Sequence, residues 1–193
     1  MSPVGAVARW RGLRKADPGL GAVHVATTDW QHPTYGQQRR RRRGLPPQMA
    51  DVLLSEAPLV LKAEPTQQLL TGWASVIEHP DGTPVVDSQG DIIGEADLVE
   101  AAQHFMRHAR VACDNHVRIP GPQGQHIPKQ VGTVVESLVV TRALKAALNL
   151  PPSTPTGWLV TLHIEDPAVW ADVVAGHRES LSIGGTAVRE EAE

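Results

Sequence analysis

The chain has 193 residues, of which 41% are hydrophobic, and its 18 Lys and Arg against 21 Asp and Glu give a net charge of −3. This length suits one domain with appendages, and the hydrophobic content excludes a chain that is disordered throughout. The sequence has no apolar run of about 18 residues, so it predicts neither a membrane-spanning helix nor contact with a membrane. The single cysteine, Cys113, excludes an internal disulfide, and no group of Cys and His has the spacing of a zinc site.

Charge is divided unevenly along the chain. Residues 1–50 carry nine basic and two acidic side chains, a net charge of +7, whereas residues 51–193 sum to −10. The basic part contains a run of five arginines, Arg39, Arg40, Arg41, Arg42 and Arg43. Because adjacent arginines repel one another, the sequence predicts a mobile basic arm over residues 1–48. The run is interpreted either as a solvated tail that aids solubility or as an anchor for nucleic acid or an acidic partner.

The folded domain is predicted to begin after a linker over residues 49–68 and to occupy residues 69–193. Its first strand is predicted over residues 69–77, before a turn that contains Pro80, Asp81 and Gly82. Residues 95–108 place their apolar side chains on one face and acidic side chains in the first turn, which predicts a helix.

The second half of the domain predicts mainly strands. They are expected over residues 111–117, 131–141, 158–164 and 180–188. Between the last two, Asp166 supplies a helix N-cap and Pro167 the first helical position, so a short helix should run to about residue 175 and stop at Gly176. Strands and helices out of βαβ order predict an α+β domain, a small β-barrel ringed by a few helices.

Three residues stand out as candidates for catalysis. His116 ends a predicted strand before a glycine-rich loop, and Ser182 precedes two glycines whose neighbouring amides can approach a substrate closely. Glu136 lies within a β-branched strand, where a carboxylate either faces solvent or has a partner. Taken singly, a structural histidine, a glycine-containing strand and an exposed acid explain them as well.

The other histidines have weaker signals. His104 and His108 lie four residues apart on the predicted helix, but no third ligand accompanies them, which favours a solvated face. His24 lies in a polar context that requires no function.

Several motifs occur together in one order. They are Gly72-Trp-Ala-Ser-Val, Val86-Asp-Ser-Gln-Gly-Asp91, Asp114-Asn-His116, Gly132-Thr-Val-Val-Glu136-Ser, Gly157-Trp-Leu-Val, Asp166-Pro-Ala-Val-Trp170 and Leu181-Ser182-Ile-Gly-Gly185. Over residues 70–188 this ordered set resembles the phage serine proteases of the XkdF type. Such proteins are similar to prohead (capsid maturation) proteases and, more distantly, to herpesvirus assemblins, whose fold is a small β-barrel ringed by helices.

The resemblance implies a catalytic arrangement. It places the catalytic histidine at His116 and the nucleophile at Ser182, with His116 as the general base that takes the serine proton. Glu136 is the preferred third group, which would hold the imidazole in place. Assemblins use a second histidine there, and His163 and His177 remain alternatives, although strand phase turns His163 away from Trp158, Val160 and Leu162.

The function that follows is cleavage of scaffold and immature capsid protein inside the phage prohead, in the host cytoplasm. The expected partners are those proteins and further copies of the chain, with nucleic acid contacted through the arginine run. No metal or cofactor is implied. The alternative is a non-catalytic head component that uses the same barrel structurally, with the basic arm on DNA or an acidic scaffold.

Overall fold

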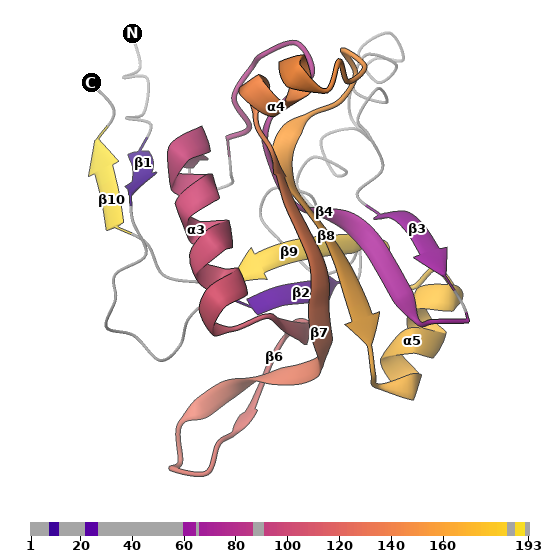
Figure 1. Ribbon diagram of the computed structural model, residues 1–193. Coiled ribbons are helices and arrows are strands. Elements are labelled where there is room, and N and C mark those ends of the chain that lie inside the picture. The colour runs from indigo at the N-terminus through magenta and orange to yellow at the C-terminus, as the bar shows by residue number, and fades with distance from the viewer. Residues whose placement is uncertain are drawn as a thin grey trace, which may run out of the picture.

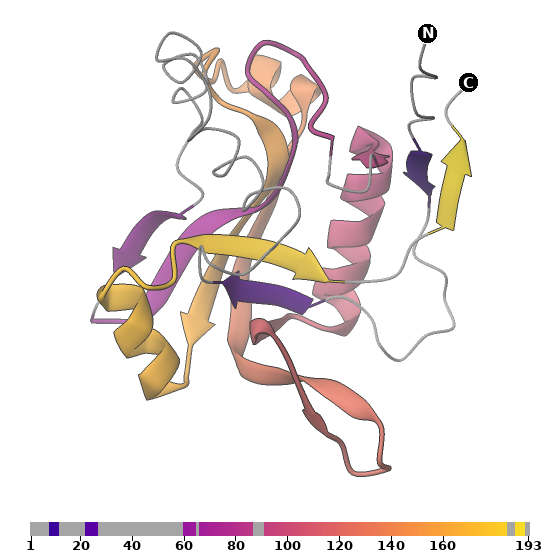
Figure 2. The same ribbon diagram turned by 180° about the vertical axis from the view of Figure 1, so that it is seen from behind.

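A curved seven-stranded sheet dominates the computed structural model, which describes residues 8–11, 22–26, 60–64, 66–86, 91–184 and 188–191 (Figures 1 and 2). The strand order is β3-β4-β8-β7-β6-β2-β9. In chain order the strands are β2 (Ala22–Ala26), β3 (Val60–Glu64), β4 (Leu69–Glu78), β6 (Val111–Pro120), β7 (His126–Val140), β8 (Thr156–Ile164) and β9 (Ser180–Gly184). Neighbouring strands are antiparallel except β2 and β6, which are parallel.

A second, three-stranded sheet joins the two ends of the chain. It has the order β10-β1-β5, built from β1 (Ala8–Arg11), β5 (Asp91–Ile93) and β10 (Val188–Glu191). Helix α3 (Glu95–His108) follows β5 directly and lies between the two sheets in both views (Figures 1 and 2). Its apolar face buries Leu98, Ala102 and Phe105, and the Phe105 ring meets the Trp158 ring edge-on at a centroid distance of 5.2 Å.

Two shorter helices complete the described part. Helix α4 (Arg142–Ala147) was not predicted. Helix α5 (Pro167–Val174) confirms the short helix predicted after the N-cap Asp166. Asp166 Oδ1 accepts hydrogen bonds from the backbone amides of Ala168 at 2.9 Å and Val169 at 3.3 Å, and Gly176 has a φ of +74° after the helix. No helix in the described ranges is long and apolar enough to cross a membrane.

Two motif glycines allow strands to pack closely. A Cβ added at Gly132 of β7 would lie 2.0 Å from the carbonyl oxygen of His163 on β8, and one at Gly157 of β8 would lie 2.4 Å from that of Ser75 on β4. Only glycine fits such positions, which explains on packing grounds why these residues begin two of the quoted motifs.

The expected α+β class is confirmed, but the expected closed barrel is not found. Strand β9 comes close to β4, yet no ladder joins these two strands in the described part, so the sheet remains open between its end strands. The start of β4 is already paired on both edges, with β3 over Leu69–Gly72 and with β8. A strand paired on both edges has no backbone groups left for a further ladder.

The predicted arm and linker contain strands. Residues 8–11 and 22–26 form β1 and β2, and Val23 and Val25 have 0% of their surface exposed, so the mobile arm does not include them. Residues 60–64 of the expected linker form β3. Burial of the Val23 and Val25 side chains between β6 and β9 stabilises β2, despite the polar residues elsewhere in the predicted arm. The arginine run lies outside the described residues and its mobility stays a prediction.

Candidate active site

Ser182 lies in the middle of β9 with 7% of its surface exposed. The predicted final strand over residues 180–188 is therefore shorter, because β9 ends at Gly184 and β10 begins at Val188. Strand β9 pairs with β2, and the residue directly opposite Ser182 is His24.

His24 is the residue that sequence reasoning missed. On its other side β2 pairs with β6, where His24 is the register partner of Cys113. Val25 and Leu181 are register partners that belong to the hydrophobic core, so Ser182, the alternate position beside Leu181, lies on the opposite face of the sheet, with His24 as its register partner. Residues directly opposite in an antiparallel pair have Cβ atoms about 4.5–5.5 Å apart. The sequence signal that could have revealed this strand is the alternation of apolar and polar residues in Val23-His24-Val25.

His116 lies on β6 inside a large bulge. The ladder with β7 passes from the pair Cys113–Gln130 to the pair Arg118–Pro128, so residues 114–117 face a single residue of β7. Within the bulge, Asn115 has a φ of +37°, and in the described part its Oδ1 is the one buried side-chain polar atom found without a hydrogen-bond partner. Bulges redirect side chains and are frequent beside active sites.

His116 and Ser182 are not on neighbouring strands. Strand β2 lies between β6 and β9, which puts two strand spacings, about 10 Å, between the backbones that carry them. The structure thus brings His24 opposite Ser182, and holds His116 on the strand beyond.

Glu136 lies elsewhere on the sheet. It is exposed on β7, and its Oε2 accepts a hydrogen bond of 2.5 Å from Thr161 Oγ1 of β8, which in turn contacts Thr71 Oγ1 at 3.0 Å. His116 lies beyond the Cys113–Gln130 pair, six residues from Glu136 along β7, which corresponds to about 20 Å. The backbone register therefore does not favour the expected contact between Glu136 and His116, because it carries the two positions toward opposite ends of β7.

The two alternative histidines have surface partners. His163 Nδ1 on β8 lies 3.9 Å from Glu165 Oε1, and His177 Nδ1 lies 3.6 Å from Asp172 Oδ1, with 41% and 70% of these imidazole side chains exposed. Trp158, Val160 and Leu162 are buried, which confirms that His163 is out of phase with them.

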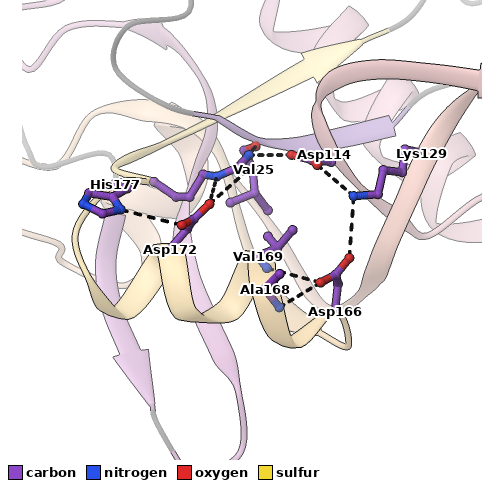
Figure 3. Close-up of polar contacts among 9 residues, drawn as sticks. Val25, Asp114, Lys129, Asp166, Ala168, Val169, Asp172 and His177 are labelled. Carbon is purple, nitrogen blue, oxygen red and sulfur yellow. Dashed lines mark hydrogen bonds and ion pairs between the residues drawn. The ribbon is translucent and has the colours of Figure 1, made fainter.

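Five charged side chains form a connected group beside these strands, here called the Asp114 cluster (Figure 3). They are Asp114, Lys129, Asp166, Asp172 and Arg178. Asp114 lies on β6, Lys129 on β7, Asp166 and Asp172 at the cap and in the body of α5, and Arg178 just before β9. The hydrogen bond to Asp114 raises the pKa of Lys129, so the lysine stays charged at neutral pH.

Cys113 is a poor nucleophile despite its register with His24. Burial, together with the charge of Asp114, raises the pKa of its thiol to about 11. The thiol therefore stays protonated at neutral pH, and Ser182 is the better candidate nucleophile on this face of the sheet.

A metal site finds no support in the described residues. No group of three or more His, Cys, Asp or Glu there could hold a metal ion. His104 and His108 pack their rings against each other on α3 at a centroid distance of 4.4 Å.

Comparison with known protein families gives a match. A family model with the description "Putative phage serine protease XkdF" matches residues 56–191, more than half of the chain. No curated protein and no solved structure matches the chain. The matched range includes Asp114, His116, Glu136, Arg178 and Ser182, but not His24.

Proposed function

Because the chain belongs to the XkdF phage serine protease family, we propose that it is a serine endopeptidase with Ser182 as the nucleophile. A serine hydroxyl is weakly nucleophilic until a neighbouring base removes its proton. The observation that carries the proposal is the register of β2 and β9, which sets a histidine position opposite Ser182. Attack of Ser182 Oγ on a peptide carbonyl forms an acyl-enzyme, and the protonated base returns its proton to the leaving amine.

His116 is the proposed general base, because the motif Asp114-Asn-His116 resembles that of the family. The β2–β9 register supports a second candidate, His24. Its strand is the direct neighbour of the strand that carries Ser182, whereas the strand that carries His116 is one strand further away. Either imidazole can perform the proton transfer, and the other can orient it. The register removes Glu136 from this part of the proposal.

The proposed substrates are the scaffold and the immature capsid protein of the same phage, cleaved inside the prohead. Membership of a phage protease family supports a phage-associated peptidase. The proposed prohead interior and the proposed self-association follow from the similarity to capsid maturation proteases.

Coexpression of the full chain with the scaffold and major capsid protein tests the nucleophile. Ser182→Ala should reduce cleavage by roughly 10⁴-fold or more, since it removes the attacking atom. Ser180→Ala is the matched control, because Ser180 lies on β9 opposite Ala26. A fluorophosphonate probe should label the wild type and the Ser180→Ala variant but not the Ser182→Ala variant. Normal cleavage by Ser182→Ala would support the alternative, a non-catalytic head component.

The two histidines are separated by chemical rescue. Replacing the general base by alanine should reduce cleavage by about 10³-fold or more, and added imidazole should restore part of it, because free imidazole can take the serine proton. His116→Ala is expected to behave in this way. His163→Ala, at an exposed position of β8, is the control. Rescue of His24→Ala but not of His116→Ala would move the base to β2.

The arginine run is proposed to recruit the enzyme into the prohead. Five like charges attract DNA or an acidic scaffold, and this attraction weakens as salt screens it. Replacing Arg39, Arg40, Arg41, Arg42 and Arg43 by glutamine should reduce the amount of encapsidated protease, measured by immunoblot of purified proheads. Equal encapsidation would identify the run as a solubilising tail.

A further inference from the structure

The Asp114 carboxylate uses both of its oxygens within the Asp114 cluster (Figure 3). Oδ1 accepts a hydrogen bond of 2.5 Å from Arg178 Nη1, and Oδ2 accepts one of 3.1 Å from Lys129 Nζ. The side chains of Asp114 and Arg178 are only 10% and 11% exposed. Removing either charge of such a buried pair costs free energy, because the remaining charge keeps only its more exposed partner, Lys129 for Asp114 or Asp172 for Arg178.

The Arg178 guanidinium extends the cluster to two further elements. Its Nε and Nη2 donate to Asp172 Oδ2 of α5 at 3.4 and 3.3 Å, and its Nη1 also donates to the backbone carbonyl of Val25 at 3.3 Å. A planar guanidinium with donors in fixed directions holds three acceptors in one arrangement, which the single ammonium of a lysine cannot do.

These contacts fall on every segment that carries a proposed catalytic group. Asp114 lies two residues before His116, Val25 directly follows His24, and Arg178 lies four residues before Ser182. The β6–β7 ladder is interrupted over residues 114–117, so regular backbone pairing with β7 does not fix the stretch around His116. The ion pair provides a connection where that ladder is missing.

We propose that Asp114 and Arg178 are positioning residues that hold the base and Ser182 in register, a proposal that rests on the proposed serine peptidase function. Lys129 secures the other oxygen of Asp114 and connects it to Asp166, 3.6 Å away at the start of α5. A displacement of about 1 Å between reacting groups can cost about 10²-fold in rate. Loss of the pair should therefore slow acylation far more than it weakens substrate binding.

The test measures how a fluorophosphonate probe labels the full chain assembled with the scaffold and capsid protein. Asp114→Asn and Arg178→Gln should each lower the limiting labelling rate about 10- to 100-fold, while the probe concentration at half-saturation changes less than about threefold. The double variant should be no slower than the slower single variant, because both changes break the same contact. Arg178→Lys, which keeps the charge but not the fork, should fall between wild type and Arg178→Gln.

Asp172→Asn is the matched control. It keeps an oxygen acceptor for Arg178 at a side chain that is 43% exposed, leaves the Asp114–Arg178 contact intact, and should stay within about twofold of the wild type. Rates are expressed per folded molecule, with the folded fraction taken from thermal unfolding of each variant. Unchanged rates per folded molecule in Asp114→Asn and Arg178→Gln, or independent effects that multiply in the double variant, would overturn the positioning role. Labelling of Ser182→Ala would instead refute the peptidase function itself.

Discussion

Ser182 and His24 occupy opposite positions on β9 and β2, although they come from opposite ends of the chain. Each residue taken alone has an ordinary explanation, since a serine in a strand and a histidine between valines are common. Their register makes the two positions candidates for a nucleophile and its base, because residues directly opposite in an antiparallel ladder have Cβ atoms about 4.5–5.5 Å apart. His24 is therefore a candidate base only because Ser182 is its register partner.

For Glu136, the local sequence suggested a catalytic role that its position in the sheet does not favour. Its β-branched surroundings suggested a carboxylate turned toward a catalytic histidine, but its Oε2 accepts from Thr161 Oγ1 and the residue is exposed. The bulge in the β7–β8 register between Val134 and Glu136 changes the phase of the strand at that point.

Glu136→Gln is accordingly expected to leave cleavage within about twofold of the wild type. The amide keeps an acceptor for the Thr161 hydroxyl, and the position is about 20 Å from the bulge that carries His116. Cleavage of the coexpressed capsid protein measures this, with His116→Ala as the reference for a lost catalytic group. A loss of more than about 10-fold in Glu136→Gln, at unchanged stability, would return Glu136 to the catalytic site.

Among the elements, β7 and β8 approach each other closely at Gly132. Gly132 permits this contact, and a Cβ there would lie 2.0 Å from a backbone oxygen that cannot move aside as a flexible side chain does. The site strand β6 pairs with the same residue, Gly132, through Ala112. Misplacement of β7 would therefore also displace the strand that carries Asp114 and His116.

Gly132→Ala is expected to destabilise the protein by about 1–3 kcal/mol, the range for overpacking a well-packed interior. The unfolding midpoint in urea measures the change. Val135→Ala, at a 49% exposed position of the same strand, is the control and should cost less than about 0.5 kcal/mol. Equal stabilities of Gly132→Ala and wild type would mean that the β7–β8 contact is looser than the structure has it.

A second contact between elements makes stability depend on pH. Glu78 of β4 is buried, and its carboxylate accepts hydrogen bonds from Arg142 of α4, including one of 2.8 Å from Nε, and from Thr156 Oγ1 of β8. The Arg142 hydrogen bond lowers the pKa of Glu78 below its ordinary value of 4.5. The stabilisation is therefore complete above pH 4.5 and is lost as the pH falls through the lower value of the folded state.

Glu78→Gln should weaken this acid dependence. At neutral pH the variant should be less stable by about 1–2 kcal/mol, the cost of a hydrogen bond to a charged group, and the gap should narrow as the pH falls. Urea unfolding at several values between pH 7 and pH 3 tests the trend, with Glu100→Gln at an exposed position of α3 as control. If the stability difference between Glu78→Gln and the wild type stayed constant over that range, Glu78 would be excluded as the source of the acid dependence.

For the whole molecule, β2 makes part of the N-terminal region a member of the seven-stranded sheet. It lies between β6 and β9 and buries Val23 and Val25 completely. Without it, β9 would lose the strand with which it pairs in the described part of the sheet. The basic run and the buried strand are therefore two different features of the first 48 residues.

Deletion of residues 1–48 is therefore expected to destabilise the domain, in contrast to what the predicted mobile arm implies. Val25→Ala alone should cost about 1–3 kcal/mol, as a buried truncation that leaves a cavity. Replacing the five arginines by glutamine should change stability by less than about 0.5 kcal/mol. Thermal unfolding compares the three variants, and a deletion variant as stable as the full chain would restore the prediction of a mobile arm over residues 1–48.

The sequence by itself determined the local features of this protein. Apolar periodicity with acidic first-turn residues located α3 at its observed bounds, and capping residues located α5 within a residue. A strand-like run before turn residues located β4 within one residue, and alternation located β8 within two, because these signals act between neighbours in the chain. The ordered motifs also identified the family. Ser182 and His116 were proposed on that resemblance, and their roles remain predictions.

The tertiary structure decided everything that depends on which strands meet. The composition of residues 1–48 does not reveal that five of them complete a sheet, because burial of Val23 and Val25 requires strands from residues 111–120 and 180–184. The separation of Glu136 from His116, the facing of His24 and Ser182, and the pairing of Asp114 with Arg178 are consequences of register. Register is set by packing and backbone hydrogen bonds between segments far apart in the chain, and a local pattern carries no information about its partner.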